Sequence, residues 1–339
     1  MRYKSVVVTR HGGPEVLAIA ENDLRQPAAG EVRIRTLAAA VSRPDITVRT
    51  GEALYTGTPL GQKIPFVPGY AIVGIVDAIG EGVHEFALGD QVGALTVVGG
   101  YSEYVYWKSA RLIAVPNRLN PVEVVPLILN YLVAYQTLHR FAAVKADERV
   151  LLIGASGGIG TALLQLGQLA RLKMYALASQ NKHAILARYG AIPMDYHTQD
   201  FVEVVHRAEP DGLHAVISGM TRMDYIRRGI SVLRRGGRLV SFGEPDSFST
   251  LFQVLRTMLS PNLLLSGKRL KLYGTSTYFL GNQKPYLEDW ATLLKLLEEG
   301  KIRPIIEKTY PLLEAAQANA LLESGQVTGN VVLVAPELL

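Results

Sequence analysis

Short apolar runs alternate with glycine- and proline-rich turns over the first 125 residues. The runs SVVV (5–8), EVRIRTL (31–37) and AIVGIV (71–76) have the length of strands, and turns such as HGGP, QPAAG and VPG separate them. Several short strands at this spacing are typical of a barrel or a sandwich. We therefore predict a β-rich region over residues 1–125.

The pattern changes near residue 125, where strand-like runs begin to alternate with helical periods. The helical stretches include TALLQLGQLARL and DYIRRGISVLRR. The strand-like runs are VLLI (150–153), MYALA (174–178), HAVIS (214–218) and RLVSF (238–242). Alternating β and α elements predict a doubly wound parallel sheet in an α/β fold.

The last part of the chain is mixed. A helical period, EDWATLLKLLEEG, covers residues 288–300, and a final strand, GNVVLVA, covers 329–335. A β-rich front, a βαβ middle and a mixed tail indicate that one domain is inserted into another. We expect residues 1–125 plus 273–339 to form the first domain and residues 126–272 the second.

Composition limits the function classes. The chain has 339 residues, of which 48% are hydrophobic and 19% charged, with a net charge of +5 and no dense Lys/Arg block. A charge this small argues against nucleic-acid binding, and we expect the pairs Arg227-Arg228 and Arg234-Arg235 to be solvated helix positions.

The chain contains no cysteine, which removes disulfides, thiolate nucleophiles and cysteine-based zinc sites. The N-terminus does not read as a signal peptide, and the most apolar segment, residues 124–135, is shorter than the ~20 residues of a membrane span. We expect a cytoplasmic enzyme without stable membrane insertion.

The heptapeptide GASGGIG (154–160) carries the clearest chemical signal, and it fits three motifs. Gly154, Ser156 and Gly158 match the nucleophile elbow of α/β-hydrolases, G-x-S-x-G. Gly154, Gly158 and Gly160 match the G-x-x-x-G-x-G turn of short-chain dehydrogenases. The doubled glycine Gly157-Gly158 before Ile159-Gly160 resembles the nucleotide loop of medium-chain reductases.

The order of residues along the chain disfavours the first two motifs. A hydrolase needs its histidine after the last strands, but the last histidine, His214, lies in the middle of the βαβ region. A short-chain dehydrogenase carries Tyr-x-x-x-Lys downstream of its turn, whereas the pair here, Tyr104 and Lys108, lies upstream. Dinucleotide binding is the interpretation that the chain order favours.

A glycine turn between a strand and a helix suits a pyrophosphate. Backbone N–H groups can approach it closely, and the helix N-terminus adds about half a positive charge. We therefore predict that Ala155, Ser156, Gly157, Gly158, Ile159 and Gly160 bind the cofactor, with the Ser156 hydroxyl as a phosphate donor.

The next strand indicates which dinucleotide binds. In NAD-binding sheets a carboxylate about 20 residues after the turn holds the ribose 2′-hydroxyl. No carboxylate occurs from Arg149 to Met194; Ser179 and Lys182 stand there instead, and Tyr196 follows. A hydroxyl and an ammonium suit the 2′-phosphate of NADP(H), although Lys182 could also be a solvated helix residue.

Over its full length the chain resembles the zinc-independent quinone oxidoreductase branch of the medium-chain dehydrogenase/reductase superfamily. The segments that carry the resemblance are PDITVRTG (44–51), IPFVPGYAIVGIVDAIGEGV (64–83), ALGDQVGAL (87–95), GGYSEY (99–104), LILNYLVAYQTL (127–138), GASGGIG and GGRLVSFG (236–243). The resemblance implies a Rossmann sheet inserted into a GroES-like β-barrel domain. It also implies that Phe242 and Gly243 face the nicotinamide.

The resemblance includes departures from the family pattern. Zinc members hold their metal with Cys, His and sometimes Glu, but Ser42 and the pair Tyr70-Ala71 occupy the matching positions here. No zinc ligand set can form from these side chains, so we predict no metal. Asn330 stands where a lysine or arginine is common near the cofactor.

The implied reaction is hydride transfer from NADPH to a quinone or to an α,β-unsaturated carbonyl. Ser42, Tyr55 and Asn130 are the candidate catalytic residues around the substrate, although Tyr55 could be a packing residue and Asn130 could bind backbone. Asp45 and Arg49 fit an i,i+4 ion pair.

Two alternatives remain open from the sequence: an enoyl reductase specific to one biosynthetic pathway, and a non-catalytic NADPH-binding protein. The resemblance also implies a homodimer. KRLKLYG (268–274) resembles the edge strand that pairs two nucleotide sheets in this superfamily.

Overall fold

The computed structural model of the chain describes residues 1–59, 61–275, 279 and 281–339. Its contacts divide the chain into two compact units. Unit 1 comprises Met1–Leu132 and Asn282–Leu339, and unit 2 comprises Val133–Gly281. The units are defined by contacts within the folded chain. The domain boundaries expected from the sequence, at residues 125 and 273, stay a prediction.

Unit 1 is built mainly from β-strands. In the described residues, β1 and β2 pair as an antiparallel ribbon, and a second sheet of seven strands has the order β14-β15-β3-β4-β5-β7 with β6 paired to β3. The strands are β1 (Arg2–Val8), β2 (Leu17–Asp23), β3 (Glu31–Val41), β4 (Ala71–Ile79), β5 (Gln91–Leu95), β6 (Tyr104–Lys108), β7 (Ile113–Ala114), β14 (Ile306–Pro311) and β15 (Asn330–Val334). Alternate side chains of β3, including Val32 and Ile34, enter an apolar core with residues of β4 and β15.

The helices of unit 1 begin with α1 (Arg43–Thr50), which has Pro44 in its first turn and ends at Gly51, whose φ of 82° lies in the left-handed region. The other helical elements that lie wholly in this unit are η1 (Pro14–Val16), η2 (Ser109–Arg111), α2 (Pro121–Pro126), the π-helix η3 (Leu127–Tyr131), α11 (Lys284–Glu298), α12 (Ala315–Glu323) and η6 (Pro336–Leu338). α3 (Leu132–Tyr135) and the π-helix η4 (Gln136–Phe141) follow η3 along the chain.

Unit 2 contains a sheet of six strands in the described residues, and all of its pairings are parallel. The strands are β8 (Arg149–Ile153), β9 (Lys173–Ala178), β10 (Ile192–Asp195), β11 (Leu213–Ser218), β12 (Leu233–Ser241) and β13 (Arg269–Leu272). Their order is β10-β9-β8-β11-β12-β13. The chain thus winds outward in both directions from β8 and β11, which is the doubly wound order of dinucleotide-binding sheets.

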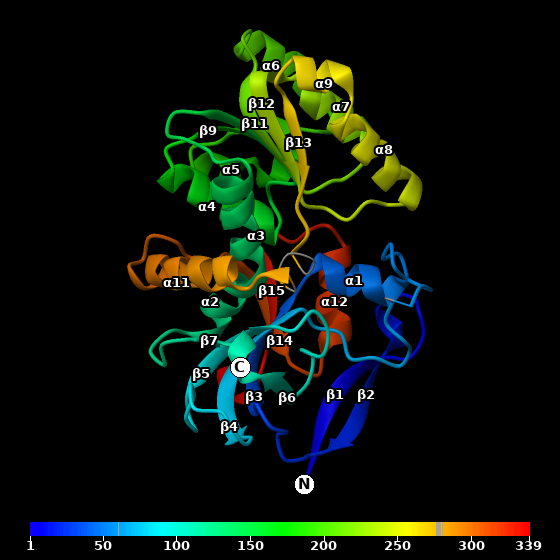
Figure 1. Cartoon of the computed structure of the whole chain (residues 1–339), viewed down its shortest axis with the longest axis vertical. Helices are drawn as coiled ribbons and strands as arrows, with labels where there is room; N and C mark the ends of the chain where they lie inside the picture. The colour runs from blue at the N-terminus through cyan, green and yellow to red at the C-terminus, as the bar shows by residue number, and fades with distance from the viewer. Residues whose placement is uncertain (60, 276–278, 280) are drawn as a thin grey trace. The chain divides into compact units, whose positions relative to one another are not determined.

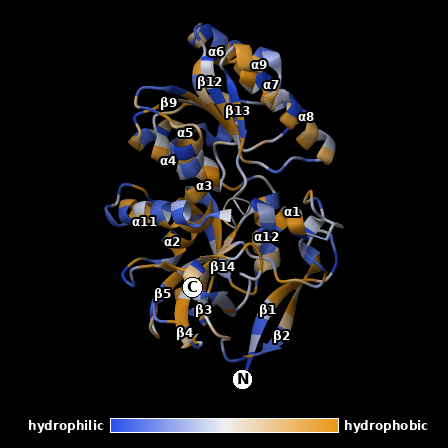
Figure 2. Ribbon diagram, in the orientation of Figure 1, coloured by the Kyte–Doolittle hydropathy of each residue, from blue (hydrophilic) through white to orange (hydrophobic). Residues whose placement is uncertain are grey.

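Helices cover both faces of this sheet (Figure 1). α4 and α5 lie to one side of the strands, and α7, α8 and α9 lie to the other. Within the described residues, the helical elements that lie wholly in unit 2 are η4, α4 (Gly158–Leu169), η5 (Gln180–Lys182), α5 (His183–Arg188), α6 (Phe201–Ala208), α7 (Met223–Ser231), α8 (Phe248–Met258) and α9 (Pro261–Leu265). Coverage on both faces explains why the strands read as near-continuous apolar runs (Figure 2).

The doubly wound parallel sheet expected from the sequence is confirmed, but one boundary is wrong. The predicted helical stretch DYIRRGISVLRR ends early, because α7 stops at Ser231 and β12 begins at Leu233. Arg234 and Arg235 are therefore exposed strand residues and not helix positions. The two arginines interrupt the apolar run of β12 at its start. In the sequence, this polar pair therefore looked like a continuation of the helical pattern.

Candidate functional site

The turn GASGGIG joins β8 to α4 and leaves backbone donors free. Gly154 has a φ of 85°, and Gly157 is the N-cap of α4 without a side-chain cap. The first hydrogen bond of the helix runs from Thr161 N–H to Gly157 O at 2.8 Å. Among the described residues, the N–H groups of Gly158, Ile159 and Gly160 meet no acceptor. Such unsatisfied groups at a helix N-terminus bind anions.

Gly160 and Gly157 differ in why glycine stands at each position of this turn. A Cβ on Gly160 would lie 2.3 Å from Ala155 C and from Gly154 O, so only glycine allows the helix to cross the turn this closely. A Cβ on Gly157 would meet nothing within 4 Å. Gly160 therefore serves the fold, whereas Gly157 borders open space in which a phosphate could lie.

The turn sits where the winding of the sheet reverses. β8 and β11 are neighbours in the sheet, but their connections leave in opposite directions. Ligands of open parallel sheets bind outside the carboxyl ends of the strands at this reversal. Gly219, after β11, donates its N–H to Ile153 O at 3.0 Å, and Ala155 N–H donates to Leu177 O at 3.2 Å. These bonds join the carboxyl ends of three neighbouring strands.

Phe242 and Gly243 extend the same edge from β12. Phe242 N–H donates to Ser218 O at 2.9 Å, and a Cβ on Gly243 would lie 2.3 Å from Gly219 O. A Cβ on Gly219 would in turn contact the Phe242 ring at 3.1 Å. The structure thus brings both predicted residues to the edge that carries GASGGIG.

Ser179, Lys182 and Tyr196 lie on the other side of the turn. Ser179 follows β9, the neighbour of β8, and its hydroxyl donates to Asn181 Oδ1 at 2.7 Å. Lys182 ends η5 and is only 8% exposed, so the alternative of a solvated helix residue is wrong. Tyr196 follows β10 and is 50% exposed, with its ring against His197 at 4.2 Å. No carboxylate occupies the end of β9.

Ser42 lies in unit 1, where it is the N-cap of α1. Its hydroxyl donates to Asp45 Oδ2 at 2.6 Å, its N–H donates to the same oxygen at 2.8 Å, and Gly69 N–H donates to Asp45 Oδ1 at 3.0 Å. Burial raises the pKa of Asp45 to about 6, although these donors act in the opposite direction. The single proton of the Ser42 hydroxyl is thus used inside the cap, and its catalytic role stays a prediction.

The expected ion pair between Asp45 and Arg49 is wrong. The Arg49 guanidinium is fully buried, pairs with Glu323 of α12, and donates to Gly12 O. Asp45 instead caps the helix, because its position in the first turn lets the carboxylate reach the N-cap N–H. Arg49 therefore ties α1 to α12 and to the loop after β1.

Asn130 and Asn330 were predicted for different roles, and the structure joins them. Asn130 Nδ2 donates to Asn330 Oδ1 at 2.6 Å, and Asn330 Nδ2 donates to Ile305 O at 2.9 Å. Asn130 lies in the π-helix η3, and both amides are buried. Its buried amide is thus satisfied by another side chain and not by backbone.

Tyr55 packs beside a small apolar cluster of Val8, Val16, Val48, Ala53 and Phe66. It is half-buried, which agrees with a packing role and does not test a catalytic one. Among the residues that the structure describes, no group of three His, Asp or Glu side chains could hold a metal ion. Elsewhere in unit 1, a cavity of about 360 Å³ is lined by residues such as Arg35, Thr36 and Tyr104 and by none of the predicted site residues.

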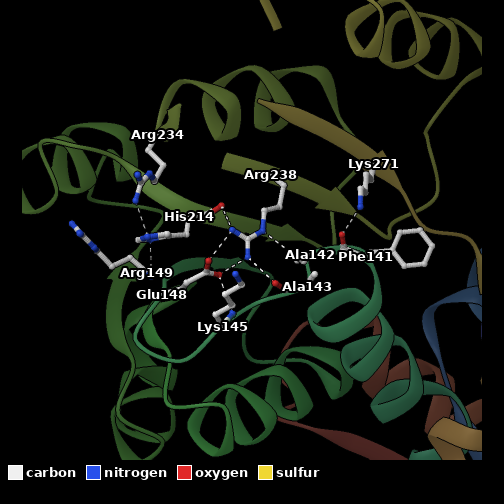
Figure 3. A network of polar contacts seen from close by, with 10 residues as sticks. All are labelled: Phe141, Ala142, Ala143, Lys145, Glu148, Arg149, His214, Arg234, Arg238 and Lys271. Atoms are coloured by element: carbon white, nitrogen blue, oxygen red, sulfur yellow. Dashed lines mark hydrogen bonds and ion pairs between the residues drawn. The ribbon is translucent and has the colours of Figure 1, made fainter. Parts of the chain in front are cut away.

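A polar network that the sequence did not predict lies at the amino end of the sheet in unit 2 (Figure 3). Arg238 pairs with Glu148 and donates to the carbonyl oxygens of Ala142, Ala143 and His214. Burial raises the pKa of Glu148, but the hydrogen bonds from Arg238 and from the Lys145 N–H, together with the charge of Arg238, outweigh burial, and the net pKa is lowered. Arg238 thus holds the segment from Ala142 to Glu148, which leads into β8, against the sheet.

His214 lies between two donors in this network. Arg149 N–H donates to His214 Nδ1 at 3.2 Å, and an Arg234 guanidinium nitrogen lies 3.0 Å from His214 Nε2. Burial lowers the pKa of His214, the Glu148 carboxylate opposes this, and the neighbouring arginines lower the pKa again, so that it is lowered overall. Its position is explained by packing and hydrogen bonding.

Comparison with known proteins connects this geometry to a family. A model described as "Alcohol dehydrogenase GroES-like domain" matches residues 28–117, and one described as "Zinc-binding dehydrogenase" matches residues 189–333. A "Quinone oxidoreductase" of Lama guanicoe is 28% identical over 98% of this chain and 97% of its own. A "Synaptic vesicle membrane protein VAT-1 homolog" of Danio rerio is 28% identical over 98% of this chain and 70% of its own.

Solved structures share the fold. The Escherichia coli quinone oxidoreductase complexed with NADPH has a TM-score of 0.85 at 24% identity, with 98% of this chain and 99% of that chain covered. The CurK enoyl reductase has a TM-score of 0.87 at 24% identity, with 99% of each chain covered.

The GroES-like region and the doubly wound sheet together define an oxidoreductase of the two-domain dehydrogenase class. Within that class, the chain belongs to the quinone oxidoreductase branch of the medium-chain dehydrogenase/reductase superfamily. The resemblance seen in the sequence is thereby confirmed. Within the described residues, no helix has the length and apolar character that a membrane crossing requires.

Proposed function

We propose that this chain is an NADPH-dependent, zinc-independent oxidoreductase that transfers a hydride to a quinone or to an α,β-unsaturated carbonyl. The observation that carries the proposal is the carboxyl edge of the sheet in unit 2. It has free N–H groups after β8 and Ser179 and Lys182 after β9, with no carboxylate at the end of β9. The NADPH complex of the Escherichia coli relative supports a nicotinamide cofactor of this kind.

Different residues of this edge would bind different parts of the cofactor. The N–H groups of Gly158, Ile159 and Gly160 would bind the pyrophosphate, together with the Ser156 hydroxyl. Ser179, Lys182 and Tyr196 would bind the 2′-phosphate, because a hydroxyl and an ammonium attract a dianion that a carboxylate would repel.

The bound cofactor would supply the hydride, and the protein would supply orientation and polarity. Phe242 and Gly243 would border the nicotinamide end of the site. Negative charge develops on the acceptor oxygen during the transfer, so a hydrogen-bond donor there lowers the barrier. Tyr55 and Asn130 are the proposed donors, with Asn330 orienting the Asn130 amide through their hydrogen bond. Ser42 is proposed to lie around the substrate while its hydroxyl stays bound to Asp45.

Zinc independence rests on the side chains that replace the ligands of zinc members. Ser42 and Tyr70-Ala71 stand at those positions, and the chain has no cysteine. A hydroxyl, a phenol and a methyl group do not make the thiolate and imidazole set that zinc prefers. Quinols and enolates can take their proton from water or from a nearby hydroxyl.

We also propose a homodimer that pairs through β13. This strand ends the sheet order, so one of its edges has no strand partner among the described residues. An open strand edge is a template for pairing with another chain. Light scattering tests this proposal: a monomer mass at all concentrations would contradict it.

The direct test of the function compares NADPH and NADH oxidation with phenanthrenequinone and with a simple enone. We expect turnover with NADPH, no dependence on added zinc, and no loss of rate with a chelator. Product analysis then separates the acceptors, since a quinol and a saturated ketone are distinct compounds. Tight NADPH binding without turnover of any acceptor would refute the reductase and favour a binding role.

A further inference from the structure

Two loops of unit 2 meet at the carboxyl edge of the sheet, one after β11 and one after β12. The two strands are neighbours in the sheet (Figure 1). The first loop covers residues 219–222 and the second covers residues 242–247. The second loop carries Phe242 and Gly243, which we place beside the nicotinamide, so the contacts that hold this loop bear on the proposed reaction.

Thr221 joins the two loops through its side chain. Its hydroxyl oxygen lies 2.5 Å from Gly243 O and 2.6 Å from Ser241 Oγ. A hydroxyl has one proton and a carbonyl oxygen can only accept, so Thr221 donates to Gly243 O and accepts from Ser241 Oγ. Thr221 is 2% exposed and Ser241 is fully buried, which shields these bonds from water and strengthens them.

The backbone brings the loops together but leaves both polar groups of Gly243 to other partners. Phe242 N–H donates to Ser218 O at 2.9 Å and continues the pairing of β12 with β11. Among the described residues, Gly243 N–H meets no acceptor, and Gly243 O accepts from the Thr221 hydroxyl. The carbonyl of Gly243 is therefore held by a side chain, while its N–H is left for a ligand.

Close packing limits the positions that Gly243 can take. A Cβ on Gly243 would lie 2.3 Å from Gly219 O and 3.2 Å from Thr221 N. The backbone thus confines this residue, and the bond from Thr221 sets the direction of its carbonyl group.

We propose that Thr221 is a positioning residue for the nicotinamide end of the cofactor site. Its hydroxyl fixes Gly243, so that the Gly243 N–H is available to an acceptor oxygen on the nicotinamide half of the cofactor. This inference rests on the proposed function, in which Phe242 and Gly243 border the nicotinamide. Hydride transfer requires a fixed orientation of the reacting groups, and a fixed Gly243 serves that requirement.

The test compares two ligands by isothermal titration. NADP⁺ reports on the whole site, whereas 2′-phospho-ADP-ribose lacks the nicotinamide and reports on the rest. Thr221→Val replaces the hydroxyl by a methyl group of similar size, and it should weaken NADP⁺ binding about fivefold and leave binding of 2′-phospho-ADP-ribose unchanged. Thr221→Ala removes the same hydroxyl without adding a methyl group beside the carbonyl, and it should give the same pattern. Thr221→Ser keeps the hydroxyl and should bind both ligands like the wild type.

Thr137→Val is the matched control for the loss of a buried hydroxyl. Thr137 is also fully buried in unit 2, but its hydroxyl donates to Val133 O at 2.7 Å within its own helical segment. This variant should bind both ligands like the wild type. Equal weakening of the two ligands by Thr221→Val and Thr221→Ala would show a merely structural role and overturn the proposal, as would unchanged binding of both.

Hydrogen exchange of the protein without cofactor tests the contact itself. Gly219 N–H and Phe242 N–H are hydrogen-bonded, and both should exchange faster in Thr221→Val than in the wild type, because the loops are no longer joined. Unchanged exchange at both amides would show that the backbone alone fixes Gly243 and would overturn the proposal. Failure of the proposed reductase function is distinguishable, since it would appear as a wild type that turns over no acceptor while the binding pattern of the variants is as expected.

Discussion

The two edges of the sheet in unit 2 are both rich in hydrogen-bond donors, but only one of them leaves its donors unsatisfied. At the amino edge, Arg149 and Lys173 begin neighbouring strands and both pair with Glu209. At the carboxyl edge, the N–H groups of Gly158, Ile159 and Gly160 face no acceptor in the described part of the chain. The protein thus supplies its own anions at one edge and leaves donors without a protein acceptor at the other.

At the amino edge, the Glu209 carboxylate neutralises the positive charges of Arg149 and Lys173. Its carboxylate accepts from Tyr175 Oη at 2.6 Å and pairs with Lys173 Nζ at 2.6 Å and with Arg149. Burial raises the pKa of Glu209, but the bonds from Lys173, Tyr175 and Arg149 outweigh burial and lower the pKa to about 2. A cationic cluster of this kind is therefore structural and does not mark an anion site.

The largest expected effect comes from the carboxyl edge. Gly160→Ala places a Cβ 2.3 Å from backbone atoms of Gly154 and Ala155, so the turn must shift. We expect the free energy of unfolding to fall by about 3 kcal/mol, measured by chemical denaturation, with loss of NADPH binding.

Gly157→Ala is the matched control for the same turn. Its Cβ meets nothing within 4 Å and its φ of −77° suits any residue, so stability should be unchanged. NADPH binding should nevertheless weaken about tenfold or more, because the Cβ enters the space proposed for the pyrophosphate. If both variants lost stability equally, the distinction between the two glycines would be wrong.

The second effect concerns the amino edge and pH. The pKa of Glu209 is lower in the folded chain than in the unfolded one, so its stabilisation is present above about pH 4.5 and is lost as the pH falls towards 2. Glu209→Gln should lower the free energy of unfolding at pH 7 by about 3 kcal/mol and should flatten its acid dependence in this window.

Glu203→Gln, an exposed change in α6, is the control for this variant and should leave both quantities unchanged. The affinity for NADPH should stay at the wild-type value in Glu209→Gln, measured in the folded range. A large loss of cofactor affinity would break the contrast between a structural edge and a ligand edge.

The third and smallest effect is on cofactor choice. Ser179→Asp/Lys182→Gln adds a carboxylate and removes an ammonium where we place the 2′-phosphate. The ratio of kcat/KM for NADPH to that for NADH should fall about 30-fold. Lys295→Gln, at a side chain that is 75% exposed on α11, is the control and should keep the ratio. An unchanged ratio in the double variant would place the 2′-phosphate elsewhere.

The sequence predicted the features that depend on local pattern. The alternation of apolar runs and helical periods predicted the parallel sheet, and the glycine turn predicted the edge at which the free N–H groups lie. The resemblance to the family pointed to Phe242 and Gly243, which the structure brings to that edge. The sheet and the turn follow from periodicity and from the backbone freedom of glycine.

Contacts between distant residues could not be predicted in this way. The Asn130–Asn330 bond spans 200 residues, and Glu323, the partner of Arg49, lies 274 residues away, so neither pairing has a signature in local spacing. The i,i+4 spacing of Asp45 and Arg49 suggested a pair, but burial directed the two side chains to different partners. The network of Arg238 was missed for the same reason.

The central claim is that the carboxyl edge binds a dinucleotide that carries a 2′-phosphate. Isothermal titration of the wild-type protein with NADP⁺ and with NAD⁺, at one salt concentration, tests it most directly. The account predicts that NADP⁺ binds at least about tenfold more tightly, because Ser179 and Lys182 offer donors and no carboxylate opposes the phosphate. Equal affinity for the two dinucleotides, or tighter binding of NAD⁺, would contradict it.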